Sequence, residues 1–302
     1  MSTTQHPQDS PLGVAFAASA YTLWGLMPLY WRLLHHVPPL ELTIHRVAWC
    51  AVAVGLAVLW RDRFKAARVA LKNPRLIATL ALSSLLISMN WGLYIWCVAT
   101  DQLVEGSLGY YINPLVSVAL GFALLGERLT RLRLAAIALA AVAVAIQTLT
   151  IGHFPWIALT LAVSFGFYGY LRKTAAIEAV DGLFIETAIL FPVAAGLIAV
   201  WMVEGTGAFA SVSLATDAML ALAGVMTAVP LALFSAGARR IRLSTLGFLQ
   251  YIAPSISLVL ATVWFGEPFT QIHAVTFGLI WFALALISLE GLRTRRAETA
   301  EA

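Results

Sequence analysis

Charged residues are scarce in this sequence: Asp, Glu, Lys and Arg make up 11% of its 302 residues. An ordinary soluble domain carries about 25% charged residues. Because hydrophobic residues reach 61%, the composition excludes a water-soluble globular domain and places the chain in the membrane class. The formal net charge of +4 does not indicate a nucleic-acid partner, since the basic residues lie in short stretches between apolar runs. The partner that the composition predicts is the lipid bilayer.

Cysteine and recognisable chemical motifs are also lacking. The two cysteines, Cys50 and Cys97, lie inside apolar runs, so we interpret them as packing residues and expect neither a disulfide framework nor a metal site. Residues 1–10 contain no Lys or Arg, so they lack the basic region of a signal peptide and the first apolar run is expected to be retained. No Gly-x-x-x-x-Gly-Lys-Ser/Thr loop is present, which argues against ATP hydrolysis in this chain, and we expect no cofactor.

Long apolar runs are what the sequence has in abundance. A membrane-spanning helix needs about 20 mostly apolar residues, and lipid offers the backbone no other hydrogen-bonding partner than the helix itself. Ten runs meet this description: 11–31, 39–60, 76–97, 103–125, 133–151, 155–171, 183–203, 217–237, 243–265 and 271–290. The sequence therefore predicts an all-α integral membrane protein, with short tails at 1–10 and 291–302 and real loops only at 61–75 and 204–216.

The basic residues predict the orientation. If the N-terminus is cytoplasmic, all of the 19 Lys and Arg residues except Arg32 and Arg46 fall in cytoplasmic loops or in the C-terminal tail. Cytoplasmic loops are known to carry an excess of Lys and Arg. This asymmetry favours ten spans with both termini in the cytoplasm.

Two similar stretches predict an internal repeat. One includes Pro114 and ends at Gly126-Glu127, and the other includes Pro254 and ends at Gly266-Glu267, so a shift of 140 residues superimposes them. Five spans per half is an odd number, so the halves 11–151 and 155–290 are expected to have opposite orientations in the membrane. Inverted repeats are typical of transporters, whose substrate site lies in a central cavity near the midplane between the halves.

The motifs also resemble those of a known family. They are Trp24-Gly25, Glu41 with His45-Arg46 and Trp49, Asn90-Trp91, Ser107-Leu108-Gly109-Tyr110, Ile112-Asn113-Pro114-Leu115, Gly126-Glu127-Arg128, Phe167-Tyr168-Gly169, Arg172-Lys173, Glu186-Thr187, Leu243-Ser244-Thr245-Leu246-Gly247, Gln250-Tyr251 and Gly266-Glu267. In this order they are similar to the EamA family of the drug/metabolite transporter superfamily. The resemblance implies ten helices in two EamA repeats in the bacterial inner membrane, and a secondary transporter that exports a small organic metabolite or drug. It implies no particular substrate.

Five ionisable residues within or at the ends of the spans are candidates for proton coupling or gating: Glu41, His45, Arg46, Glu105 and Glu186. A charged side chain at the centre of a membrane helix costs about 2.5–3.5 kcal/mol, so such residues are expected to have a partner or a function. Glu41 and His45 are one helical turn apart, and a histidine beside a carboxylate can titrate near neutral pH. The alternative is structural: ion pairs at span ends, with Glu105 meeting Arg46 or Arg32, Glu186 meeting Arg172 or Arg240, and Arg46 extending to lipid head groups.

Aromatic and amide side chains are the candidates for the substrate cavity: Trp24, Asn90, Trp91, Tyr94, Tyr110, Asn113, Tyr168, Gln250 and Tyr251. Aromatic rings with an amide can hold a planar or cationic solute. Pro114 and Pro254 each remove a helical hydrogen bond, and paired helix breaks point to the binding site of a transporter. The alternatives are an aromatic belt at the membrane surface and hydrogen bonds that only join helices.

Other classes of function remain open at this point. A membrane scaffold or sensor would not need inverted repeats. An intramembrane enzyme is not expected, because His-Glu-x-x-His and Gly-x-Ser-x-Gly are both absent from the sequence. The expected partners are a small-molecule solute, protons if transport is coupled to their gradient, and lipid. The oligomeric state is not determined by the sequence.

Overall fold

The structure, a computed structural model, describes residues 10–60, 72–125, 130–151, 154–238, 240–241, 245–246 and 249–301. Its regular elements within these ranges are all helical. They are α1 (Pro11–Leu33), α2 (Pro39–Trp60), α4 (Pro74–Ala99), α5 (Leu103–Leu125), α6 (Arg131–Ile151), α7 (Trp156–Thr174), α8 (Ala179–Glu204), α9 (Leu214–Ala238), α11 (Ile252–Val259) continued by the π-helical turn η1 (Leu260–Trp264), and α12 (Gln271–Glu301). The all-α prediction is confirmed, and nine of the ten predicted runs each contain one helix in the described ranges.

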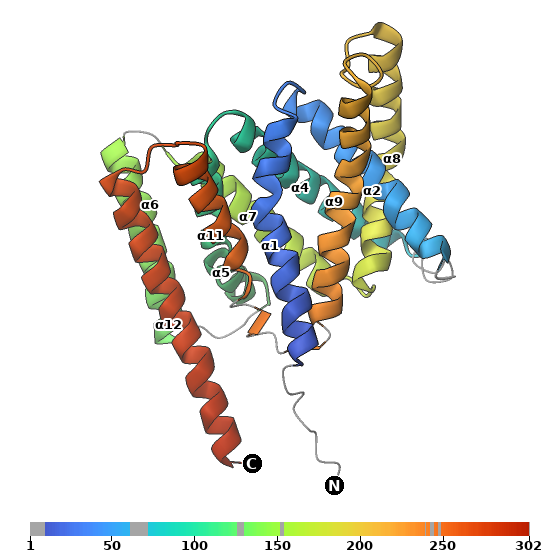
Figure 1. Ribbon diagram of the computed structural model, residues 1–302. Coiled ribbons are helices and arrows are strands. Elements are labelled where there is room, and N and C mark those ends of the chain that lie inside the picture. Colours follow the sequence, from blue (N-terminus) through green and yellow to red (C-terminus); the bar gives the residue numbers. More distant parts are fainter. Residues whose placement is uncertain are drawn as a thin grey trace.

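Eight of the helices in the described ranges are long and apolar enough to cross a membrane. The two others are α7, which ends in Arg172-Lys173, and α11 with η1, which is short. Both pack inside the bundle, α7 against α4 and α5 and α11 against α1 and α5. The start of α1 and the end of α12 lie at the same end of the bundle (Figure 1), which we call the terminal face. The opposite end, formed by the connections 34–38, 100–102, 205–213 and 265–270, is the distal face.

The ninth predicted span, 243–265, is not one helix. Gln250 and Tyr251 form a turn, and α11 begins at Ile252, so Pro254 is the third residue of a new helix rather than a mid-span residue. Proline has no N–H to donate to the carbonyl four residues earlier, but the first turn of a helix needs no such donor. Pro114 differs, because α5 continues through it from Leu103 to Leu125. The predicted pair of helix breaks is therefore wrong at Pro114.

The other differences from prediction are at the ends of elements. Helix α12 runs on to Glu301, through most of the predicted tail 291–302, because this stretch is rich in Ala, Glu and Arg, which favour helix. The predicted loop 204–216 is present as residues 205–213. The loop predicted at 61–75 lies mostly in residues 61–71, outside the described residues, and so does Gly126-Glu127-Arg128.

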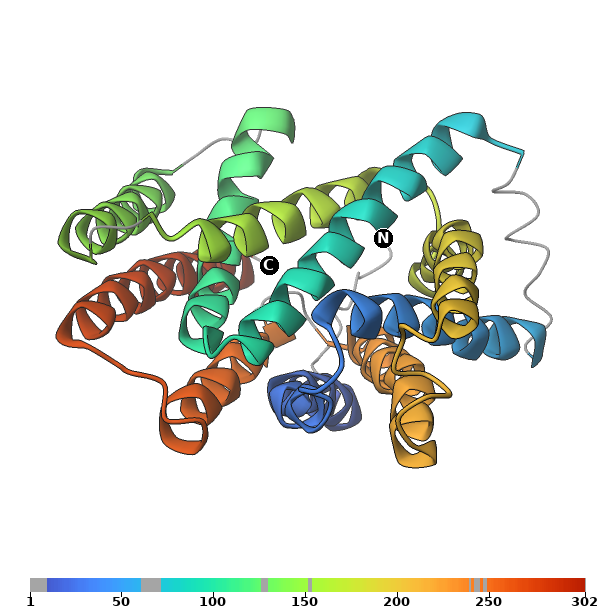
Figure 2. The same ribbon diagram turned by 90° about the horizontal axis from the view of Figure 1, so that it is seen from above.

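Three helix starts in the first half recur at the same interval in the second half. Helices α8, α9 and α12 begin at Ala179, Leu214 and Gln271, each 140 residues after the starts of α2, α4 and α6. The contacts recur as well: α5 packs on α7 as α11 packs on α1, α2 packs on α9 as α8 packs on α4, and α1 packs on α9 as α7 packs on α4. Helices α6 and α12 pack on each other at one edge of the bundle (Figure 2).

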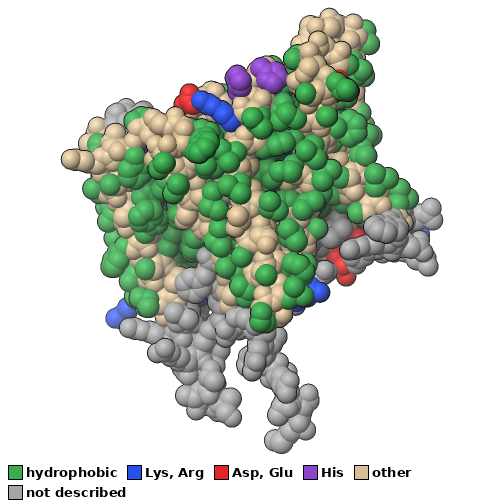
Figure 3. Space-filling view, in the orientation of Figure 1, with side chains coloured by type: hydrophobic (Ala, Val, Ile, Leu, Met, Phe, Trp, Pro, Cys, Tyr) green, Lys and Arg blue, Asp and Glu red, His purple; other side chains and the backbone are tan. Residues whose placement is uncertain are grey.

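Apolar side chains cover the band between the two faces of the bundle (Figure 3). Exposed examples come from different helices, including Leu149 at 84%, Val203 at 88% and Val263 at 79% exposure. A water-soluble protein does not expose so many large apolar side chains, whereas lipid solvates them. The buried interior contrasts with this surface, because it contains charged and amide side chains, which form the candidate site.

Candidate functional site

Arg46 is a buried cation at the centre of the candidate site. Its side chain projects from the second turn of α2 and is 6% exposed. The guanidinium carbon lies 4.2 Å from the ring centre of Trp91 in α4 and 5.1 Å from that of Trp31 in α1. Arg46 Nε donates to Thr227 Oγ1 in α9 at 2.8 Å. Four helices from both halves of the chain therefore meet at one positive charge.

The burial of Arg46 is offset by rings rather than by a carboxylate. A charge at mid-membrane costs about 2.5–3.5 kcal/mol. A desolvated cation–π contact contributes about 2 kcal/mol, and a hydrogen bond to a charged group about 1.5–3 kcal/mol. Trp31, Trp91 and Thr227 are thus sufficient to hold the charge in place. Among the described residues no carboxylate pairs with Arg46, and Nε is its only nitrogen with a hydrogen-bond partner. The side chain does not extend to the membrane surface, so that structural alternative is wrong.

A hydrogen-bonded chain of aromatic and amide residues continues from Trp91 along α4. Asn90 donates to the carbonyl of Leu161 and to Ser164 Oγ in α7, each at 2.9 Å, and accepts from the Tyr110 hydroxyl at 3.1 Å. The Tyr94 ring meets the Tyr110 ring edge-on at 5.2 Å. Asn90 thus joins α4, α5 and α7, which is the helix-joining role that we considered as an alternative to a cavity role.

Tyr94 extends the same chain into the second half. Its hydroxyl hydrogen-bonds Ser257 Oγ in α11 at 2.8 Å. Asn113, one turn beyond Tyr110 in α5, is 8% exposed, and its Oδ1 has no hydrogen-bond partner within the described ranges. A buried polar atom without a partner is costly and needs an explanation, such as a ligand or an ordered water. Among the cavity candidates, Asn113 is thus one whose side-chain oxygen has no hydrogen-bond partner among the described residues.

The remaining aromatic candidates lie in other contacts. Tyr251 stacks on Tyr111 of α5, and Gln250 precedes it in the turn before α11. Trp24 packs edge-on against Tyr21 and also contacts Phe234 of α9. Tyr168 packs on Phe165 and is a neighbour of Glu186. The structure therefore brings Asn90, Trp91, Tyr94, Tyr110 and Arg46 together. Phe165 links Tyr168 to Tyr110, since its ring lies 6.1 Å from that of Tyr110 and 5.8 Å from that of Tyr168, whereas Trp24 and Tyr251 lie in other aromatic clusters.

Glu41 and His45 lie at the distal end of α2. Glu41 Oε1 is 3.9 Å from His45 Nε2, as the turn spacing predicted. The same oxygen accepts the backbone N–H of Ala208 at 2.6 Å and of Phe209 at 3.4 Å, so Glu41 holds the loop 205–213 of the other half. The His45 ring packs 5.0 Å from that of Phe209, and neither of its nitrogens has a hydrogen-bond partner in the described part of the chain.

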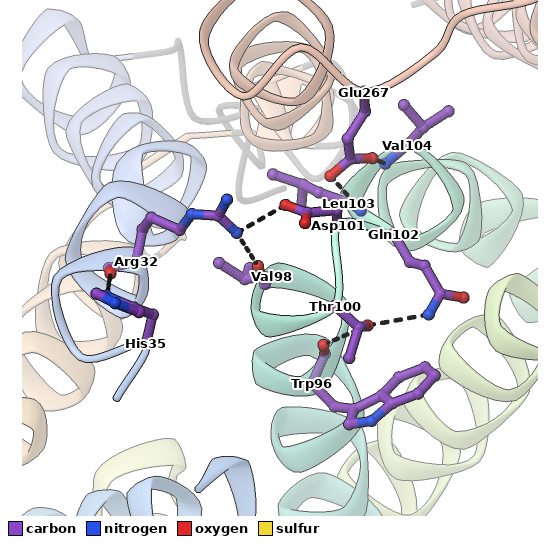
Figure 4. Close-up of polar contacts among 10 residues, drawn as sticks. All are labelled: Arg32, His35, Trp96, Val98, Thr100, Asp101, Gln102, Leu103, Val104 and Glu267. Carbon is purple, nitrogen blue, oxygen red and sulfur yellow. Dashed lines mark hydrogen bonds and ion pairs between the residues drawn. The ribbon is translucent and has the colours of Figure 1, made fainter. Parts of the chain in front are cut away.

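Glu267 makes the matching contact in the opposite direction (Figure 4). Its two carboxylate oxygens accept the backbone N–H groups of Leu103 at 2.8 Å and Val104 at 2.7 Å, which begin α5. An anion at a helix N-terminus satisfies otherwise unpaired N–H groups. Gly266 has a φ of +71°, which favours glycine and turns the chain toward α5. Burial raises the pKa of the Glu267 carboxyl above its ordinary value, and the two N–H bonds counteract this in part.

Arg32 neighbours this contact on the distal face. It pairs with Asp101 at 2.7 Å and donates to the Val98 carbonyl at 3.1 Å (Figure 4). We considered an ion pair of Glu105 with Arg32 or Arg46. In the structure Arg32 pairs with Asp101 instead, and Glu105 lies in the first turn of α5. A surface pair of this kind contributes about 0–1 kcal/mol.

Glu186 forms the buried charge pair toward the terminal face. Its Oε1 lies 3.7 Å from Arg172 Nε and accepts a short hydrogen bond from Ser83 Oγ of α4. The Glu186 side chain is 1% exposed and that of Arg172 is 14% exposed. Of the two partners considered for Glu186, Arg172 and Arg240, the structure places Arg172 beside it. Arg46, by contrast, is a buried cation for which no described residue supplies a counter-charge.

The sequence did not identify three of the partners of Arg46 and Glu41, which are Trp31, Thr227 and the backbone of Ala208. Trp31 lies at the end of a span, where an aromatic belt is the usual interpretation. Thr227 is one of many hydroxyls in apolar spans. Nothing local marks these residues, because their partners lie far away in the sequence.

Known proteins resemble the chain along nearly its whole length. The "EamA-like transporter family" matches residues 11–149, close to the predicted first half. An "Uncharacterized transporter" of Vibrio cholerae is 41% identical over 98% of each chain. The chain belongs to the EamA family. "Protein RarD" of Escherichia coli is 41% identical, covering 94% of this chain and 96% of that protein. A "Chloramphenicol-sensitive protein RarD" of Pseudomonas aeruginosa is 28% identical over 95% of this chain and 96% of its own length.

The EamA family membership and the apolar helices together make this a multi-pass membrane protein and a membrane transporter of the drug/metabolite superfamily. A solved structure described only as "Crystal structure of protein" has a TM-score of 0.57 and 22% identity, and covers 93% of this chain and 98% of that one. That likeness concerns the fold alone. The names of these relatives do not state a substrate, so they give no solute to compare with the residues around Arg46.

Proposed function

We propose that this EamA-family protein is a secondary transporter that moves a small organic solute by alternating access between two inverted halves, 11–151 and 155–290. Both termini are then cytoplasmic and the distal face is external, which agrees with the charge asymmetry of the loops. The solute site lies between the halves, around Arg46, Trp91, Tyr110 and Asn113. Export is the direction that the family resemblance favours.

The observation that carries this proposal is the exchange of helix contacts between the halves. Three contacts between the halves have a counterpart in which the roles are exchanged: α5 on α7 with α11 on α1, α2 on α9 with α8 on α4, and α1 on α9 with α7 on α4. A two-fold relation between similar units produces this pattern. Since each half has five helices, such a relation inverts one half relative to the membrane, as in many secondary transporters.

The distal contacts supply the gate that alternating access requires. Glu41 of the first half holds Ala208 and Phe209 of the second, and Glu267 of the second half holds Leu103 and Val104 of the first. Tyr30 also donates a short hydrogen bond to the Met219 carbonyl across the same boundary. We interpret this arrangement as a closed distal gate. Opening it requires these carboxylates to release backbone N–H groups.

Reconstitution into liposomes tests the proposal. Liposomes loaded with a metabolite mixture are diluted into labelled single solutes, and a transporter gives saturable counterflow above that of empty liposomes. A Glu41→Gln/Glu267→Gln double variant is expected to change the rate, since its gate is weakened. Absence of counterflow for every solute in a broad panel, with protein shown to be folded, contradicts transport.

An imposed pH gradient distinguishes the two energy sources. Uptake that follows the gradient supports proton coupling, for which His45 and Glu41 are the candidates on the distal side and Glu186 is the candidate on the terminal side. Saturable uptake that is indifferent to the gradient supports movement down the gradient of the solute itself. The measurement is the initial rate at equal and at opposed internal and external pH.

A further inference from the structure

We propose that Arg46 binds the anionic group of the transported solute, so that the substrate class is a small organic anion, a carboxylate or similar group on an apolar or aromatic body. This inference rests on the transport function proposed above. It names the chemistry that the site selects, which neither the family nor the names of the relatives specify.

The first argument is charge. The guanidinium of arginine stays protonated in proteins, so Arg46 places a positive charge among α1, α2, α4 and α9. The buried carboxylates that share the interior are engaged elsewhere. Glu41 and Glu267 hold backbone N–H groups, and Glu186 pairs with Arg172 and Ser83. A buried charge without a counter-charge is a functional candidate, and here the missing partner is an anion.

The second argument is geometry. The guanidinium carbon of Arg46 lies over the rings of Trp31 and Trp91, and Thr227 Oγ1 accepts its Nε–H. The hydroxyl of Thr227 donates to the Ala223 carbonyl at 2.9 Å, which fixes its oxygen as an acceptor for Arg46. These three contacts hold the guanidinium in place, and no described residue accepts its terminal N–H groups. A planar fork with fixed orientation matches the two oxygens of a carboxylate.

The third argument is the surrounding surface. The rings of Trp31, Trp91, Tyr94 and Tyr110 offer an apolar body many contacts near the charge. Asn113, on the same face of α5 as Tyr110, keeps an unpartnered Oδ1 that can accept from an N–H or O–H of the solute. The Trp91 face that we expected to receive a cation is covered by Arg46, whose charge repels cations. An organic anion fits this set of groups better than an organic cation.

Matched probes test the inference in detergent. The thermal unfolding of the full-length protein is measured with phenylacetate and benzenesulfonate, with their neutral amides, and with phenethylammonium. Both anions are expected to raise Tm, with an affinity about tenfold or more above that of the amides. The inference is overturned if the amides or phenethylammonium raise Tm as much as the anions do, or if neither anion raises Tm.

Variants locate the effect at Arg46. Arg46→Met keeps an unbranched apolar side chain without the charge and is expected to abolish the shift, while Arg46→Lys keeps the preference for anions with a lower affinity. Arg32→Met, which removes a cation of the distal face, is the matched control and is expected to bind like the wild type. If Arg46→Met does not fold, Thr227→Val is measured instead, because it removes the hydrogen-bond acceptor of the Arg46 Nε. This variant is expected to weaken the binding of phenylacetate several-fold, and phenethylammonium is expected to remain unbound. An unchanged phenylacetate affinity in Arg46→Met or Thr227→Val contradicts the site.

Liposome counterflow separates this inference from the proposed function. Transport of neutral or cationic solutes that Arg46→Met leaves intact supports a transporter but overturns the anion site. Anion binding that requires Arg46, without transport of any solute, supports the site but contradicts the transport function. Transport of benzenesulfonate that Arg46→Met abolishes supports both.

Discussion

Tyr111 and Tyr251 stack on each other with ring centres 6.1 Å apart and an angle of 14° between the rings. They are 140 residues apart, the interval that separates the starts of α2, α4 and α6 from those of α8, α9 and α12. When two similar units are related by a two-fold axis, a residue meets its own equivalent only beside that axis. The stack therefore supports an axis that passes between α5 and the start of α11.

The same interval relates the two buried charges. Arg46 in α2 and Glu186 in α8 occupy equivalent positions, yet one is a cation with aromatic neighbours and the other a carboxylate paired with Arg172. Two positions related by the 140-residue shift thus carry buried charges of opposite sign. A site between the two halves is asymmetric, as the binding of an asymmetric solute requires.

The crossing of α9 over α2 depends on Gly224. A Cβ atom at this position would overlap the backbone of Trp49 and Cys50. Gly224→Ala is expected to separate the two helices and to lower Tm strongly, because backbone atoms cannot move aside as a flexible side chain can. Gly196→Ala is the matched control, since nothing lies within 4 Å of its Cβ, and the higher helix propensity of alanine is expected to leave Tm unchanged or higher. Equal effects of the two substitutions contradict close packing at Gly224.

The Arg172–Glu186 pair is expected to behave as a buried ion pair. Arg172→Met leaves the Glu186 carboxylate buried without its cation, which typically costs about 3–5 kcal/mol. Glu186→Gln in the same background removes the uncompensated charge and is expected to recover much of the lost stability. The measurement is thermal unfolding of both single variants and the double variant. Additive losses in the double variant argue against direct coupling of the pair.

The distal gate is expected to respond to pH through Glu267. Because burial raises its pKa in the closed state, the carboxyl binds a proton more tightly there than in an open state that exposes it. Raising the pH from the ordinary value of 4.5 through the raised pKa therefore weakens the closed state, and acidification strengthens it. Its charged neighbours act oppositely: Asp101 raises the pKa of Glu267 and Arg32 lowers it.

Labelling measures this response. A cysteine introduced at Asn113, in a chain with Cys50 and Cys97 replaced by alanine, is expected to react more slowly with a membrane-impermeant maleimide added from the distal side as the pH falls toward 5. Rates are corrected for the intrinsic pH dependence of the reagent with a cysteine at exposed Leu33. Glu267→Gln is expected to lose the pH dependence that Glu267 adds. If the pH response persists unchanged in Glu267→Gln, the response belongs to another group.

The two buried asparagines are expected to differ in role. Asn90→Ala leaves the Tyr110 hydroxyl and Ser164 without their partner and is expected to destabilise the protein by about 1–3 kcal/mol. Asn113→Ala removes an amide whose Oδ1 has no partner in the described ranges, so Tm is expected to change little while transport or solute affinity falls. Thermal unfolding and counterflow of the same preparations compare them. A large loss of Tm in Asn113→Ala assigns it to packing.

The sequence by itself determined the spans, because the length and polarity of each run are set by the bilayer and not by its neighbours. Helices α2 and α5 begin and end at the predicted residues, and the 140-residue shift seen in Pro114 and Pro254 recurs in the helix starts. Local turn spacing also identified the Glu41–His45 neighbours. The break before α11 was not predictable, because a proline in the first turn of a helix and a proline within a helix look alike in the sequence.

Only the tertiary structure decided which partner each polar group meets. Glu267 caps a helix that begins 164 residues earlier in the chain, and Arg46 bonds Thr227 across 181 residues. These distances are bridged by helix packing, in which close approach at glycines such as Gly224 sets which side chains face one another. The sequence identified Arg46 as a costly charge in a membrane, and the packing of α1, α2, α4 and α9 gave it aromatic neighbours in place of a carboxylate.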